Sequence, residues 1–199
     1  MKMQINNYWP YMAFKKPITQ NKNEKLIELK KSMQKIDLEF KNNANNFVFN
    51  DGDINADIML IGEAPGEEED KEGIPFVGKS GKLLRYFLKE ANFKNYYITN
   101  IIPWRPPNNR TPEKSEIILM QPFIKKHIEI IAPKIIIPVG ATALKALEIN
   151  ESITNTQGII HNSSIGAIFP IYHPSYALRV PEKKKELWLS LLKLKQIMK

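Results

Sequence analysis

The sequence contains no cysteine among its 199 residues. Without thiols the chain cannot form a disulfide, a thiolate zinc site, a cysteine-ligated iron–sulfur cluster or a cysteine nucleophile. Long apolar runs are missing as well, because stretches such as Ile135–Val139 fall far short of the roughly 20 residues that span a bilayer. The N-terminal sequence MKMQINNYWPYM lacks the apolar core of a signal peptide. We therefore expect no membrane contact and a cytoplasmic location.

The composition is that of a folded domain. Hydrophobic residues make up 43% of the chain and charged residues 25%, which excludes wholesale disorder. No repeat or flexible linker divides the sequence, so we expect an N-terminal extension over 1–22 and one domain over 23–199. The net charge of +8 suits a polyanionic partner such as nucleic acid, and the lysine bias of an AT-rich genome explains it equally well.

Hydrophobic patterning predicts alternating strands and helices. Short, continuously apolar runs predict buried strands over 56–61, 96–99, 134–139 and 167–172. Apolar residues at helical spacing predict helices over 23–37, 80–91 and 181–198. A further helix over 111–130 is predicted by its start, where Thr111 is an N-cap followed by Pro112 and Glu113. This order predicts a three-layer α/β/α sandwich with a mostly parallel sheet of about four strands.

Ligands of such folds bind beyond the carboxyl ends of the strands, where three loops are expected here. The first, Gly62–Gly81, is rich in glycine but matches neither a P-loop nor a dinucleotide-binding motif. Glu63 follows a strand directly, which suits a catalytic carboxylate and a loop-capping acid equally well. The acidic run Glu67–Asp70 fits a solvated segment better than a metal site, because no histidine adjoins it.

Four stretches, in their order and spacing, resemble the motifs of family 4 uracil-DNA glycosylases: GEAPGEEED, PFVGKSGKLL, YITNIIPWRPPNNRTP and HPSYALR. The resemblance covers the chain from about Lys35 onward, and IPWRPPNN resembles the form found in alphaproteobacterial members. It implies a monomeric enzyme that flips uracil out of DNA and hydrolyses its N-glycosidic bond, leaving an abasic site.

The resemblance also implies a set of base-binding residues. Phe76 matches a phenylalanine that stacks on uracil, and Gly62 and Ala64 belong to the motif that lines the same site. Asn100 matches an asparagine that pairs with O4 and N3 of the base, since an amide offers both an acceptor and a donor.

His173 and two carboxylates are the catalytic candidates that the resemblance implies. His173 matches a histidine near uracil O2 that would stabilise negative charge on the leaving base, as a neutral donor or as a cation. Glu63 would orient or activate water against the sugar, with Glu69 as a second candidate. The choice between these two carboxylates stays open at this point.

DNA contacts are expected from the second and third loops. Arg105 and Arg110 flank a turn in the second loop, and Ser175 and Arg179 follow His173 in the third. Guanidinium and hydroxyl groups there would grip phosphates on either side of a flipped nucleotide. A solvated basic face is the alternative for either second-loop arginine taken alone.

The sequence departs from the family at the iron–sulfur cluster. Members of family 4 typically hold a [4Fe–4S] cluster with four cysteines, whose positions correspond here to Lys35, Leu38, Trp104 and Met120. We expect no cluster and no other cofactor, and we expect the last three side chains to pack as an apolar plug.

Two further functions are considered. The chain would be a catalytically silent or altered-specificity reader of uracil or damaged bases in DNA if turnover was lost with the cluster. Covalent trapping of the sugar by a histidine in the second loop is excluded, because IIPWRPPNNR contains none.

We predict that the purified protein is colourless and holds no stoichiometric iron, because it has no thiolate to bind a cluster. Visible absorption and metal analysis check this. Tightly bound iron at about four atoms per chain, the content of the family's cluster, would contradict it.

Overall fold

Four parallel strands form the centre of the sheet in the computed structural model, which describes residues 19–198. In spatial order they are β3 (Tyr97–Asn100), β2 (Ile58–Gly62), β4 (Ile135–Pro138) and β6 (Gly166–Ile168). All four lie within or next to the apolar runs that predicted strands.

Two short edge strands extend this sheet, which within the described residues has six strands rather than the expected four. β1 (Asn50–Gly52) pairs antiparallel with β3, and β5 (His161–Ser163) pairs antiparallel with β6. Their sequences, NDG and HNS, are polar and lack any alternation, so no hydrophobic pattern indicates them.

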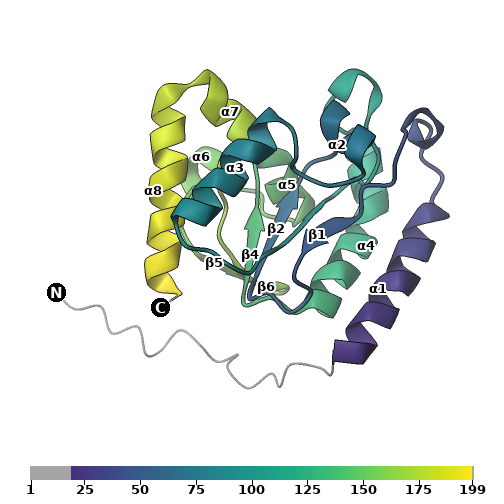
Figure 1. Cartoon of the computed structure of the whole chain (residues 1–199), viewed down its shortest axis with the longest axis horizontal. Coiled ribbons are helices and arrows are strands. Elements are labelled where there is room, and N and C mark those ends of the chain that lie inside the picture. Colours follow the sequence, from purple (N-terminus) through teal and green to yellow (C-terminus); the bar gives the residue numbers. More distant parts are fainter. Residues whose placement is uncertain (1–18, 199) are drawn as a thin grey trace.

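Helices cover both faces of the sheet, which confirms the three-layer α/β/α fold (Figure 1). Met59 and Ile61 of β2 point into one core, with α1 (Thr19–Gln34), α4 (Lys114–Ile131) and α5 (Ala141–Ala146). Ile58 and Leu60 point into the other core, with α3 (Lys79–Glu90), α7 (Pro174–Arg179) and α8 (Pro181–Ile197). Short helices α2 (Glu67–Glu72) and α6 (Ile153–Thr156) lie in connecting segments. Within residues 19–198, no helix combines the length and apolarity that a membrane span requires.

The first helix begins earlier than its periodicity predicts, at Thr19 instead of Asn23. Lys22 explains part of the difference, because its buried ammonium donates to the carbonyls of Ile54 at 3.2 Å and Ile131 at 2.6 Å. Ile131 is the last residue of α4, where a cation is favourable. Most of the predicted extension over 1–22, namely residues 1–18, lies outside the described residues.

The start of α4 also differs from the prediction. The helix begins at Lys114 with Glu113 as its N-cap, not at Thr111. The Glu116 carboxylate accepts a hydrogen bond from the Glu113 amide at 2.7 Å. It also accepts hydrogen bonds from both terminal nitrogens of Arg110, at 2.9 and 2.6 Å. These bonds hold the segment before Lys114 outside the helix.

His127 is a fully buried side chain of α4 beneath the sheet. Its Nε2 lies 2.6 Å from the Tyr97 hydroxyl, and its ring stacks on Phe49 with centroids 4.8 Å apart. Burial lowers the pKa of the imidazole to about 3, so the folded protein keeps it neutral.

We predict that acidification destabilises the fold through His127. An unfolded histidine gains its proton near pH 6.5 and the folded one does not, so the stability present above pH 6.5 falls by about 2 kcal/mol per such histidine on reaching pH 5. Urea unfolding of wild type and His127→Gln at both pH values measures this, with His161→Gln as the control. An unchanged pH slope in His127→Gln would show that this imidazole is not the cause.

Candidate active site

The carboxyl ends of the parallel strands bring the motif-bearing loops to one edge of the sheet. Gly62 ends β2 and Asn100 ends β3, and the two residues are paired in register. Val139 forms a bridge to Ile171 beyond β4 and β6, and the Gly140 amide donates to the Ile171 carbonyl at 2.8 Å. His173 follows Ile171 by two residues, and a Cβ at Gly140 would lie 2.9 Å from the His173 Cβ.

Phe76 lies against this edge. A Cβ added to Gly62 would overlap Oδ1 of Asn100 and lie 2.5 Å from Cζ of Phe76, so only glycine leaves room for both side chains. The Phe76 ring centroid is 6.2 Å from that of His173. The structure therefore brings together four of the residues predicted from the sequence: Gly62, Phe76, Asn100 and His173.

Glu69 has a structural partnership that the sequence pattern does not indicate. Its carboxylate accepts the backbone amides of Gly66 at 3.1 Å, Val77 at 2.9 Å and Gly78 at 2.8 Å. The neighbouring Asp70 accepts the amides of Asn45 and Asn46. The expectation of a wholly solvated acidic run is thus wrong for Glu69 and Asp70, which are buried, while Glu67 and Glu68 are exposed.

Glu63 differs from Glu69 in its surroundings. It comes immediately after β2 and is half-buried, and its backbone carbonyl accepts a hydrogen bond from the Ile102 amide at 3.1 Å. Ala64 beside it is also half-buried and packs against the core on the α1 and α4 side. No hydrogen bond or ion pair of the Glu63 carboxylate appears among those found for the described residues.

His173 is held in a defined orientation at the start of α7. Its Nδ1 accepts the Ser175 amide at 3.2 Å and lies 2.7 Å from the Ser175 hydroxyl. Because an amide only donates, the neutral ring carries its proton on Nε2. Burial and, to a smaller extent, the charge of Arg179 lower the pKa of His173 to about 4, while the charge of Glu69 opposes the change. Near pH 7 the imidazole is a neutral donor, one of the two forms considered from the sequence.

The candidate DNA-binding residues differ in their surroundings. Arg110 forms a two-pronged ion pair with Glu116 and lies over the Phe40 ring at 5.3 Å, which gives it a structural role at the start of α4. The Nε of Arg105 donates to Oδ1 of Asn109 at 2.7 Å, and its guanidinium is 3.6 Å from Glu67. Arg179 is exposed near the end of α7.

The positions that correspond to cluster ligands do not fit an iron–sulfur cluster. Leu38, Trp104 and Met120 are buried in the same apolar core, where the Phe47 ring meets Trp104 edge-on with centroids 4.9 Å apart. Lys35 is exposed just beyond α1. None of these side chains supplies a thiolate to bind iron. Across residues 19–198, no cluster of three or more His, Asp or Glu side chains is placed to hold a metal ion.

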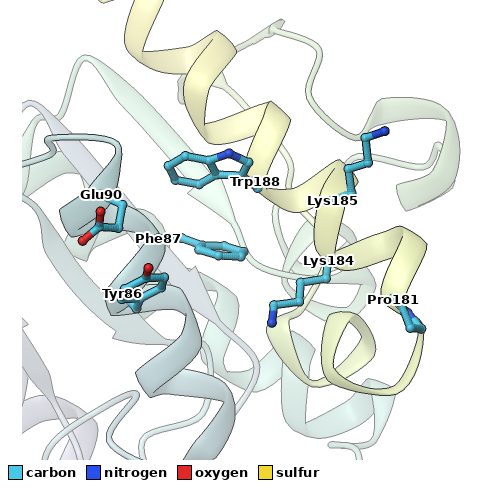
Figure 2. A pocket seen from close by; sticks show the side chains of 7 residues that line it. All are labelled: Tyr86, Phe87, Glu90, Pro181, Lys184, Lys185 and Trp188. Atoms are coloured by element: carbon cyan, nitrogen blue, oxygen red, sulfur yellow. The ribbon is translucent and has the colours of Figure 1, made fainter.

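A cavity of about 450 Å³ lies elsewhere, between α3 and α8 (Figure 2). Trp188 and Phe87 lie beside each other in it, with ring centroids 5.2 Å apart. Its lining is Tyr86, Phe87, Glu90, Pro181, Lys184, Lys185 and Trp188. None of these belongs to the residues predicted for the site, so this cavity is separate from the strand-edge site.

Sequence reasoning missed Arg85, which bonds the backbone at Phe76 from α3. Its position in an amphipathic helix is typical of a solvent-facing cation. No motif in the sequence marks it as part of the site.

Comparison with known proteins shows the family to which this fold belongs. The chain belongs to the uracil DNA glycosylase superfamily, whose family model matches residues 49–193. A "Type-4 uracil-DNA glycosylase" of Sulfurisphaera tokodaii is 40% identical over 187 residues, covering 87% of this chain and 84% of that protein. Proteins of the same name from Saccharolobus solfataricus and Thermotoga maritima are 41% and 42% identical, over 76% and 69% of this chain and 76% and 74% of theirs.

We predict that Glu69→Gln lowers the free energy of unfolding by about 1–3 kcal/mol, because an amide cannot accept all three backbone N–H groups. Glu68→Gln, which alters an exposed carboxylate on the same helix, should change stability little. Urea unfolding at pH 7.5 compares the two variants. Equal stabilities would contradict the structural role of Glu69.

Proposed function

We propose that this protein is a uracil-DNA glycosylase that excises uracil from DNA by hydrolysis and leaves an abasic site. The observation that carries the proposal is the convergence of Phe76, Asn100 and His173 at one strand edge, in a chain 40% identical to a protein of that name. A stacking ring, an amide and a neutral imidazole donor together suit an extruded pyrimidine.

Base recognition in this proposal depends on Asn100 and Phe76. The Asn100 side chain offers an acceptor for N3–H and a donor for O4 of uracil. The Phe76 ring provides the stacking face, and Gly62 allows the ring and the amide to lie together. Thymine presents the same polar edge, so the space near its methyl group would provide the discrimination.

Bond cleavage in this proposal uses His173 and Glu63. The N–glycosidic bond breaks with its electron pair passing to uracil, and Nε2–H of His173 donates toward the growing charge on O2. Water, oriented by the Glu63 carboxylate, adds its oxygen to the sugar carbon, and the proton that it loses ends on the released uracil anion, so that the products are neutral uracil and an abasic sugar. Glu63 is favoured over Glu69 for this step, because three backbone amides already engage Glu69.

DNA binding in this proposal uses Arg105 and Arg179. Arg110 is already paired with Glu116, and the Ser175 hydroxyl already contacts His173. Both residues therefore have a structural role in addition to any contact with a phosphate. A monomeric state and a cytoplasmic location stay predictions.

One assay tests the function. A labelled single-uracil oligonucleotide is incubated with the protein and then treated with alkali, which cleaves the strand at an abasic site. We expect cleavage at the uracil position and none with a thymine control. Binding without cleavage would support the silent reader, and cleavage at another base would support altered specificity.

We predict that His173→Ala lowers the single-turnover excision rate by about 10²-fold or more, the scale for removing one donor to a developing oxyanion. DNA affinity should change little. Because the pKa of His173 lies at about 4, the wild-type rate should not fall as pH rises through 6.5. His161→Ala, a change on β5, is the control. Wild-type rates in His173→Ala would refute the assignment.

A further inference from the structure

Arg85 of α3 makes a dense set of contacts behind the Phe76 loop. Its Nε donates to the Phe76 carbonyl at 2.9 Å, and one terminal nitrogen donates to the Pro75 carbonyl at 2.8 Å. The same nitrogen lies 2.6 Å from the Asp51 carboxylate on β1, and the other donates to the Tyr96 hydroxyl at 3.2 Å. The guanidinium thus joins the loop to the edge strand of the sheet.

Phe76 needs such support, because its backbone is in the left-handed region with φ of 56°. A phenylalanine seldom adopts that conformation unless its surroundings impose it. α3 packs directly on this backbone, since a Cβ at Gly81 would overlap the Phe76 carbonyl carbon. The hydrogen bonds to the neighbouring peptide groups therefore determine the direction in which the Phe76 ring points.

Two opposite charges hold those peptide groups. Glu69 accepts the amides of Val77 and Gly78, and Arg85 donates to the carbonyls of Pro75 and Phe76. The stretch of backbone that carries Phe76 is consequently bonded on each side of the ring. Of the two groups, only Arg85 comes from outside the loop and the motifs.

We propose that Arg85 is a positioning residue for excision: it fixes the Phe76 backbone so that the ring is ready to stack on the extruded base, and Asp51 holds the guanidinium in place. This rests on the proposed function. Arg85 touches neither the base nor the sugar in this account and acts through Phe76. A lysine keeps the charge beside Asp51 but lacks the planar fork that reaches two carbonyls, so it replaces arginine only in part.

The first test compares Arg85→Met, Arg85→Lys and Lys89→Met, the last an exposed cation on the same helix. Single-turnover excision should fall about 10-fold or more in Arg85→Met, less in Arg85→Lys and not in Lys89→Met, because a misplaced stacking ring lowers the fraction of productive complexes. Affinity for the abasic product should stay unchanged. Circular dichroism confirms that each variant is folded at the assay temperature, and Arg85→Lys serves if Arg85→Met is not.

The second test separates positioning from general stability by a double-mutant cycle with Phe76→Leu. If Arg85 acts through the ring, Arg85→Met or Arg85→Lys should slow excision less than about 2-fold further in the Phe76→Leu background. Independent, multiplying effects in that cycle would overturn the proposal, as would a wild-type rate in both Arg85 variants.

A third readout does not need turnover. The ratio of affinities for a 2′-fluoro-2′-deoxyuridine oligonucleotide, which resists cleavage, and its thymidine counterpart should fall in Arg85→Met and not in Lys89→Met. If wild type fails to excise uracil, the proposed function fails, and this ratio still decides the role of Arg85. An unchanged ratio would reject it.

Discussion

The pairing of Gly62 with Asn100 across two parallel strands is the constraint on which the site depends. Because β2 and β3 run in the same direction, their last residues lie side by side at one edge. The missing side chain of Gly62 leaves space that the Asn100 amide and the Phe76 ring share. β4 and β6 continue the same edge and carry His173 into position through the close contact at Gly140.

Charge supports this arrangement away from the chemistry. Two side chains of opposite charge bond the backbone around Phe76. Glu69 accepts from the amides that follow it, and Arg85 donates to its carbonyl. His173, in contrast, is uncharged, because burial lowers its pKa, and the Ser175 amide fixes its tautomer. In the proposed function, the ionised groups Glu69 and Arg85 would position the loop and the neutral His173 would donate the hydrogen bond.

Elements with a hydrophobic pattern could be predicted from the sequence, and those made by polar contacts could not. The central strands and the main helices follow from apolar periodicity, and motif order places Asn100 and His173 at the same edge. β1 has too few residues and too little apolar character to be predicted from the sequence. The partners of Glu69, the ion pair of Arg110 and the reach of Arg85 depend on contacts between distant segments, such as Arg85 with Asp51. Spacing along the chain carries no record of those contacts.

The packing of Leu38, Trp104 and Met120 within one apolar core has a consequence for how the protein is made. In a domain that contains a metal cluster, the part of the core around the cluster cannot fold fully until iron and sulfide are bound. Here the region is finished by burial of side chains that arrive with the polypeptide. The prediction that no cluster binds therefore implies that this region needs only synthesis and folding, and not a supply of iron, to be completed.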